Sequence, residues 1–377
     1  MDVFRTENNC LKFHYDAEEL WIQPWGENSF RIRATKLAEM PKENWALEMP
    51  VEDIVPKIQI EEKRASIING KIKAVISSYG KLTIYNSKDE ILLDEYLRNR
   101  LDVFADYCSA LDIEAREFKP ILGGDYHLSM RFVSNPEEKI YGMGQYQQPY
   151  LNLKGTDLEL AQRNSQASVP FAVSSLGYGF LWNNPGVGRV MFGKNITTWE
   201  AYSTKVLDYW ITAGDSPAEI EEAYASVTGT VPMMPDYAMG FWQCKLRYQT
   251  QDELLNVARE YKKRGLPISV IVIDYFHWPL QGDWKFDEKY WPDPDAMIQE
   301  LKEMGIELMV SIWPTVDYRS ENFQEMKEKG YLIRTDRGFR IVMDFQGNTV
   351  HYDATNPAAR EYVWQKAKKN YYDKGIK

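Results

Sequence analysis

The amino-acid sequence predicts a β-sandwich domain over residues 1–232, followed by an alternating α/β domain over residues 233–377. Three observations predict this division. Short runs in which apolar and polar residues alternate, separated by turn signals, fill the first part. Near-continuous apolar runs alternate with helical patterns in the second part. The segment VPMMPDYAMG, residues 231–240, separates the two rhythms.

Several segments of the first part have the alternation expected of half-buried strands. In ASIINGKIKAVISSYGKLTIYN, residues 65–86, the alternation turns at Asn69-Gly70 and again at Tyr79-Gly80-Lys81. Asn-Gly between two alternating runs is the strongest short signal for a β-hairpin. YHLSMRFV alternates as well, and VPFAVSS and YGFLWNN follow as a further strand pair. Many short strands with turns between them predict a β-sandwich.

The second part alternates short apolar runs with helical patterns. The runs predict strands at 238–243, 267–274 and 306–313, and the helical patterns cover 250–265, 293–305, 320–330 and 356–375. Thr250 and Glu253 form a predicted capping box at the start of the first helix. Asn356 is the expected N-cap of the last helix, with Pro357 at its first position. Residues 376–377 have the character of the start of a further strand.

Alternating helices and apolar strands predict a parallel sheet covered by helices. Such a sheet is either doubly wound or part of a (β/α)8 TIM barrel. No Gly-x-Gly-x-x-Gly follows the first strand, so GFWQCKLRYQT, residues 240–250, lacks the phosphate cradle of a dinucleotide-binding fold. We therefore favour the first part of a (β/α)8 barrel, which three strands leave incomplete. Functional residues of a barrel lie at the carboxyl ends of its strands.

Three residues of the second part are candidates for a site. Asp274 ends the second predicted strand and is followed by rings at positions 275–278. A carboxylate beside rings can accept hydroxyl hydrogen bonds from a sugar that stacks on them, although an aspartate there can equally cap the strand. Trp313 ends the third predicted strand and is either a site residue or a core residue. Asp353 precedes the last helix and is either a site residue or a loop cap.

The composition excludes several classes of partner. The chain has 377 residues and 44% hydrophobic content, enough for large cores in more than one domain. A formal net charge of −10 without a basic run argues against nucleic acid and against an anionic membrane. Cys10, Cys108 and Cys244 are too few and too widely spaced for a disulfide framework or a metal site. With no signal-peptide pattern and no run near 18 apolar residues, we expect a cytoplasmic protein.

Several catalytic patterns are missing from the sequence. It has no His-Glu-x-x-His, no Gly-x-Ser-x-Gly and no P-loop, which argues against metal-dependent hydrolysis, serine-triad acyl transfer and nucleotide hydrolysis. The remaining residues suit sugar chemistry driven by two carboxylates, for which we expect no cofactor and no metal. The aromatic content of 14% also suits sugars, whose C–H faces stack on rings.

Six segments in order resemble motifs of glycoside hydrolase family 31. IYGMGQYQQPYLNLKG (140–155) is similar to the family's YGLGE…KG segment, and VPFAVSSLGYGFLWNNPG (169–186) to a pair of its strands. GFWQCKLRYQT and IDYFHW resemble the first and second barrel strands. KFDEKYWPDPDAMIQELKEMGIELMVSIWP and YDATNPAARE resemble the segments that follow them. The residues of GFWQ…RYQT and DYFHW are more similar to those of the family's α-xylosidase branch than to those of its α-glucosidase branch.

The resemblance implies a retaining α-glycosidase that acts on an oligosaccharide or a small α-glycoside. It implies that Asp274 binds hydroxyls of the sugar in the −1 subsite, with neighbouring rings as walls. The residues expected to bind substrate with it are Tyr275, Phe276, Trp313, Phe345 and Asp353. Phe345 departs from the family, because relatives often place a tryptophan eight residues before Asp353. A loop with Gln147 and Gln148 is expected to reach from the sandwich towards the barrel mouth.

The resemblance also implies that this chain carries no catalytic residue. The family's nucleophile is an aspartate at the end of the fourth strand and its acid/base follows later, so both are expected beyond Lys377. We expect an α-xylosidase, with an α-glucosidase or a transglycosylase of the same family as alternatives. A non-catalytic carbohydrate-binding fragment is a third interpretation, and a homo-oligomer is left open.

Overall fold

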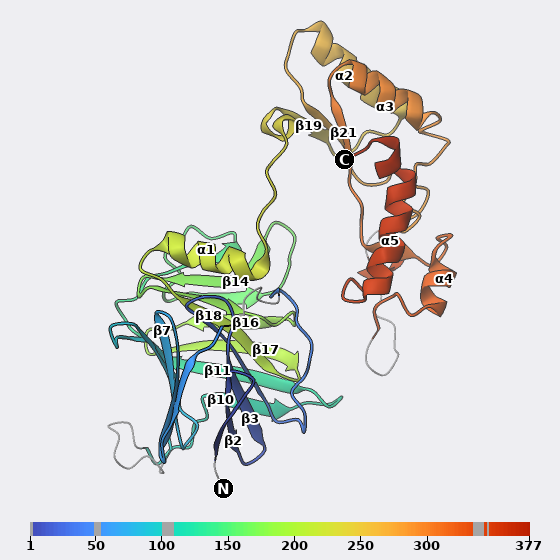
Figure 1. Cartoon of the computed structure of the whole chain (residues 1–377). Coiled ribbons are helices and arrows are strands. Elements are labelled where there is room, and N and C mark those ends of the chain that lie inside the picture. Colours follow the sequence, from blue (N-terminus) through green and yellow to red (C-terminus); the bar gives the residue numbers. More distant parts are fainter. Residues whose placement is uncertain (1–2, 49–53, 100–108, 335–342, 345–346) are drawn as a thin grey trace. The chain divides into compact units, whose positions relative to one another are not determined.

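The structure, a computed structural model, describes residues 3–48, 54–99, 109–334, 343–344 and 347–377. The chain forms two compact units, Met1–Val231 and Pro232–Lys377 (Figure 1). Strands dominate the first unit, whereas strands and helices alternate in the second. No helix among the described residues is both long enough and apolar enough to cross a membrane.

The first unit is a set of packed antiparallel sheets, as predicted. The largest has the strand order β1-β2-β3-β4-β18-β15-β14-β12, and the other two have the orders β5-β6-β7-β8-β9 and β10-β11-β17-β16-β13. Their strands are β1 (Phe4–Glu7), β2 (Cys10–Tyr15), β3 (Glu18–Pro24), β4 (Ser29–Thr35), β5 (Lys57–Ile60), β6 (Arg64–Asn69), β7 (Ile72–Ser77), β8 (Leu82–Asn86), β9 (Ile91–Asp94), β10 (Arg116–Pro120), β11 (Tyr126–Val133), β12 (Ile140–Gln145), β13 (Asp157–Leu160), β14 (Ala167–Ser174), β15 (Tyr178–Trp182), β16 (Gly188–Phe192), β17 (Ile196–Thr204) and β18 (Leu207–Ala213).

The apolar faces of these sheets share one core. The predicted hairpin is confirmed, because β6 pairs with β7 so that Asn69 lies opposite Ile72. Gly70 closes that turn with a φ of +57°, a conformation that glycine adopts without strain. The alternating apolar residues of β11 are buried with residues of the other sheets, among them Leu128 and Phe132. Alternation of apolar and polar side chains therefore predicted the inward face correctly.

The first unit also contains a helix that the alternation does not predict, α1 (Pro217–Thr228). Ser216 caps it, since its hydroxyl accepts a hydrogen bond from the backbone N–H of Glu219 at 3.3 Å. Ile220 and Val227 pack with Trp25, Phe171 and Trp210 in a smaller core. Figure 1 shows α1 lying over β14 and β18 of the large sheet. The cap serine followed by proline was the available sequence signal for this helix.

The second unit begins a parallel βα barrel. Its parallel sheet has the order β19-β20-β21, and an antiparallel sheet has the order β22-β24-β23; the described residues do not close a barrel. Its elements are η1 (Asp236–Met239), β19 (Trp242–Lys245), α2 (Gln251–Lys263), β20 (Val270–Ile273), α3 (Pro294–Glu303), β21 (Glu307–Val310), β22 (Thr315–Asp317), α4 (Phe323–Glu328), β23 (Met343–Asp344), β24 (Asn348–His351), α5 (Pro357–Asn370) and η2 (Tyr372–Lys374).

The helix caps of this unit follow the predicted residues closely. Thr250 caps α2 by accepting from the N–H of Glu253 at 3.2 Å. The Glu253 carboxylate accepts from the backbone N–H of Gln249, one residue before the cap, so the capping box is formed only on one side. Asn356 caps α5 through the N–H of Ala358 at 2.9 Å. The parallel strands are shorter than predicted, and the first lies further along the chain: residues 238–239 belong to η1, and β19 begins only at Trp242. The antiparallel sheet of β22, β24 and β23 was not predicted.

Candidate functional site

Asp274 lies at the carboxyl edge of the parallel sheet, directly after β20. The last residue of β20, Ile273, pairs with Lys245 of β19 and with Val310 of β21, so the three strands end together. The Asp274 Oδ1 atom accepts hydrogen bonds from the Tyr275 N–H at 2.7 Å and from the Ser311 hydroxyl at 3.3 Å. Within the described part of the chain, no hydrogen bond reaches Oδ2 of this half-buried carboxylate. Oδ2 is therefore left to accept a hydrogen bond from a ligand.

Three rings beside Asp274 form what we call the aromatic wall: Tyr275, Phe276 and Trp313. The Tyr275 and Trp313 rings stack with centroids 5.1 Å apart and planes inclined by 12°. The Phe276 ring lies 4.4 Å from the ring of Tyr275 and 6.4 Å from that of Trp313. All three are only partly buried in this chain. A carboxylate that borders accessible ring faces can hold a polyhydroxylated ligand with an apolar face.

The backbone at the wall is held in an unusual conformation. Phe276 has a φ of +63°, which costs free energy for a residue with a side chain and occurs often at functional sites. The Arg247 guanidinium, which follows β19, lies 5.5 Å from the centroid of the Phe276 ring. The strands β19, β20 and β21 thus each contribute a neighbouring residue to this edge.

Two further groups beside Asp274 titrate outside the ordinary range. His277 is fully buried, and burial lowers its pKa to about 4, so the imidazole is neutral near pH 7. Burial and the negative charge of Asp274 raise the pKa of the Cys244 thiol. Cys244 is therefore a thiol close to the Asp274 carboxylate and not a thiolate nucleophile.

Asp353 is not brought together with Asp274 by a contact among the described residues. Its Oδ1 accepts from the N–H of Thr355 at 2.9 Å and from the Thr355 hydroxyl at 2.6 Å, which is the behaviour of a loop cap. The preceding residue, Tyr352, donates its N–H to the carbonyl of Pro314, next to Trp313. Asp353 thus follows a segment that borders the wall, while its carboxylate bonds within its own turn. Phe345 lies outside the described residues.

Gln147 and Gln148 follow β12 in the first unit and line a small polar hollow of about 240 Å³. The other residues of this hollow include Tyr146 and Asp157. The Nε2 atom of Gln148 is buried and has no hydrogen-bond partner among the described residues. Whether this loop reaches the Asp274 site stays a prediction.

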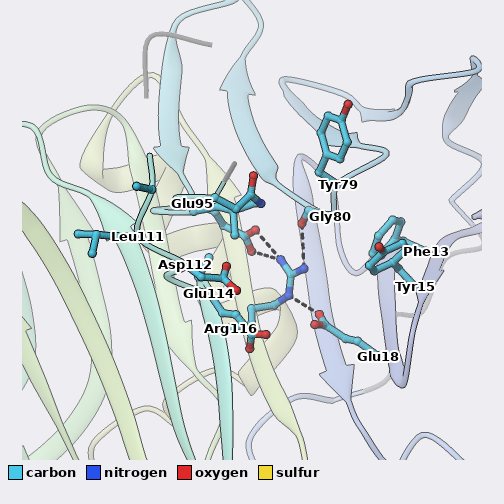
Figure 2. A pocket seen from close by; sticks show the side chains of 14 residues that line it. Phe13, Tyr15, Glu18, Tyr79, Gly80, Glu95, Leu111, Asp112, Glu114 and Arg116 are labelled. Carbon is cyan, nitrogen blue, oxygen red and sulfur yellow. Dashed lines mark hydrogen bonds and ion pairs between the residues drawn. The ribbon is translucent and has the colours of Figure 1, made fainter. Parts of the chain in front are cut away.

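A larger hollow of about 500 Å³ lies within the sheets of the first unit (Figure 2). Arg116 lines it, and its guanidinium donates hydrogen bonds to Glu18, to Glu95 and to the carbonyl of Gly80. Figure 2 shows Glu18 and Glu95 on opposite sides of this guanidinium. Burial opposes the charged guanidinium, but the carboxylates of Glu18 and Glu95 raise the pKa of Arg116 overall. These contacts occupy Arg116 in joining strands, so we place the candidate site at Asp274.

The described residues contain no group of three or more His, Cys, Asp or Glu side chains that could hold a metal ion. The candidate site is thus a carboxylate with a wall of rings at the carboxyl edge of a parallel βα sheet. The carboxyl edge of the parallel strands is where enzymes built on βα barrels place their functional residues.

The chain matches the glycosyl hydrolases family 31 TIM-barrel domain over residues 231–377 and the glycosyl hydrolase 31 N-terminal galactose mutarotase-like domain over residues 19–190. It is 52% identical to an uncharacterized family 31 glucosidase, ORF2, of Pseudescherichia vulneris, over 98% of this chain and 71% of that protein. The chain belongs to glycoside hydrolase family 31. The predicted family and fold class are confirmed.

Two proteins named α-xylosidases are similar to the chain over nearly its whole length. α-Xylosidase A of Aspergillus niger is 32% identical over 99% of this chain and 53% of that protein. The crystal structure of a family 31 α-xylosidase from a soil metagenome, complexed with xylose, superposes with a TM-score of 0.94 at 59% identity. It is matched over 99% of this chain and 56% of that one. The chain therefore spans about half the length of these α-xylosidases.

Proposed function

We propose that this chain forms the sugar-binding part of an α-xylosidase, a retaining O-glycosyl hydrolase that acts on terminal α-linked xylose of oligosaccharides. The observation that carries the proposal is the Asp274 carboxylate, whose Oδ2 has no hydrogen-bond partner among the described residues, beside the aromatic wall. The names of the α-xylosidase relatives, and the xylose in one related crystal structure, support xylose as the sugar.

In this proposal the sugar occupies the −1 subsite at the end of β20. Asp274 accepts hydrogen bonds from sugar hydroxyls, and the C–H face of the sugar packs against Trp313 and Tyr275. A retaining glycosidase also needs a nucleophile and an acid/base, two carboxyl groups about 5 Å apart. We assign neither to this chain. In the proposal they belong to the half of the α-xylosidases that the chain does not span, beyond Lys377.

An α-glucosidase is the second candidate, because the relative with 52% identity is named a family 31 glucosidase. A transglycosylase of the same family would use the same −1 subsite. Xylose differs from glucose only by lacking the hydroxymethyl group at C5, and a hydrophobic pocket discriminates such a group by one to two orders of magnitude.

The test is product analysis with isoprimeverose and maltose, on the protein as its gene encodes it. We expect release of xylose from isoprimeverose at least about tenfold faster than glucose from maltose. Faster release from maltose would favour the α-glucosidase, and transfer products would favour the transglycosylase. Sugar binding without turnover of either substrate would leave only a carbohydrate-binding role.

The cytoplasmic location and the homo-oligomer stay predictions. Fractionation of cells with an antibody to the chain tests the first, and light scattering of the purified protein tests the second.

A further inference from the structure

The end of helix α5 makes two separate contacts with the loop between β20 and α3, which begins at Asp274. Its last residue, Asn370, donates from Nδ2 to the carbonyl oxygen of Trp284 at 2.9 Å. The next residue, Tyr371, lies with its hydroxyl 3.0 Å from Nε2 of His277. The two contacts link residues 86 and 94 positions apart in the sequence. Adjacent residues at one helix end therefore hold two points of the loop that joins β20 to α3.

The first contact leads to Asp274. Nδ1 of His277 lies 3.4 Å from the carbonyl oxygen of Asp274. A carbonyl can only accept, so Nδ1 carries the proton, and Nε2 of the neutral ring accepts from the Tyr371 hydroxyl. Both rings are almost fully buried, with exposed fractions of 0% for His277 and 3% for Tyr371. Phe276, the residue with a φ of +63°, lies in the sequence between Asp274 and His277, which this contact joins.

The second contact leads to Trp313. Trp284 is buried and donates from Nε1 to the carbonyl oxygen of Trp313 at 3.0 Å. Trp284 also has a positive φ, of +46°. Each of the two links from α5 therefore includes or adjoins a residue other than glycine with left-handed backbone conformation, Trp284 in one and Phe276 in the other. Such conformations persist only where surrounding contacts hold them.

We infer that Asn370 and Tyr371 are positioning residues for the sugar site: Tyr371 holds Asp274 through His277, and Asn370 holds Trp313 through Trp284. Neither side chain is assigned a contact with the sugar. The inference rests on the proposed function as far as the sugar is concerned, but the two links are properties of the chain alone.

The test is hydrogen exchange, followed by mass spectrometry, of peptides covering 274–278 and 311–314 in the 377-residue chain. Tyr371→Phe keeps the ring and removes the hydroxyl, so exchange should rise about three- to tenfold in 274–278 and stay unchanged in 311–314. Asn370→Ala should give the reverse pattern. The exposed neighbours supply matched controls, Tyr372→Phe and Lys369→Ala, which should change neither peptide.

A merely structural role would raise exchange equally in both peptides and in α2, and that result would overturn the inference, as would no change in either variant. Xylose affinity is measured alongside, and we expect it to fall about three- to tenfold in each variant. If the unaltered chain binds no xylose, the proposed function fails for this chain. The exchange pattern still decides the positioning inference in that case.

Discussion

Tyr275 and Trp313 follow consecutive parallel strands, and their rings stack with centroids 5.1 Å apart and planes inclined by 12°. Parallel strands bring their carboxyl ends to one edge, which is why two residues 38 positions apart meet there. Asp274 lies beside the pair with one oxygen unpartnered among the described residues. The proposed sugar site lies at this edge.

Replacing Trp313 should weaken sugar binding. Trp313→Ala removes the larger ring of the stacked pair, and we expect xylose affinity to fall about tenfold, the equivalent of roughly 1.4 kcal/mol. Trp364→Ala is the control in the same unit. Trp364 lies on α5 and is exposed, and its ring contacts that of Tyr372 in η2. Calorimetric titration gives both affinities. Equal affinities for the two variants would exclude Trp313 from the sugar site.

Protonation of the buried His277 should lower the free energy of unfolding of the second unit in acid. Its folded pKa of about 4 lies below the ordinary value of 6.5, so the unfolded chain binds the proton first as the pH falls. The stabilisation is complete above pH 6.5 and declines between pH 6.5 and pH 4, by up to about 3 kcal/mol.

His277→Gln removes the titrating group and should flatten this dependence while lowering stability at pH 7. Hydrogen exchange of β20 peptides at pH 5 and pH 7, corrected for intrinsic rates, measures the free energy of opening of this unit. The prediction is wrong if the variant and the unaltered chain lose stability in parallel. The nearby titratable groups, Asp274 and Tyr371, are retained in both proteins.

Breaking the buried ion cluster of the first unit should be costly. Arg116→Met leaves Glu95, which is 1% exposed, without its guanidinium partner, and we expect a loss of about 3–5 kcal/mol. Arg189→Met breaks the exposed pair with Asp157 and should cost less than about 1 kcal/mol. Urea unfolding followed by the buried tryptophans compares the two. A similar small loss for both would show that the cluster adds no stability.

Gly142 should not tolerate a side chain. Its φ is +93°, and an added Cβ would lie 2.5 Å from the Phe171 carbonyl oxygen on the paired strand. Gly155 has a similar φ of +86°, but an added Cβ would meet no atom within 4 Å. Gly155→Ala should therefore cost about 1–2 kcal/mol for the backbone conformation alone, and Gly142→Ala clearly more. Thermal unfolding in the calorimeter ranks the pair, and an equal loss would contradict the steric explanation.

Much of the fold was predictable because many of its strands and helix starts are determined by residues close together in the sequence. Alternation gave the strands around Asn69-Gly70, and cap residues gave the starts of α2 and α5. The helix α1 was missed because the surrounding β pattern outweighed one serine–proline start. The strands β22 (TVD) and β24 (NTVH) were missed because each is short and holds only one apolar residue, whereas the similarly short β20 and β21 lie within longer apolar runs.

The candidate site was predictable only in part. The position of Asp274 after a buried strand and the rings at 275–276 are sequence signals, and parallel topology brings Trp313 to them. The contribution of Asn370 and Tyr371 could not be predicted, because it depends on a helix end returning to a loop more than 80 residues away in the sequence. For Asp353, the hydrogen bonds to Thr355 favour the loop-cap interpretation that the sequence left open.

The most direct test of the central claim is calorimetric titration of the 377-residue chain with xylose, before and after Asp274→Ala. Asp252→Ala is the matched control, since Asp252 is an exposed aspartate in the first turn of α2. We predict measurable binding to the unaltered chain and to the control, and a loss of at least about tenfold in Asp274→Ala, because charge-assisted hydrogen bonds to the sugar disappear. Undiminished binding by Asp274→Ala would contradict the placement of the sugar at the end of β20.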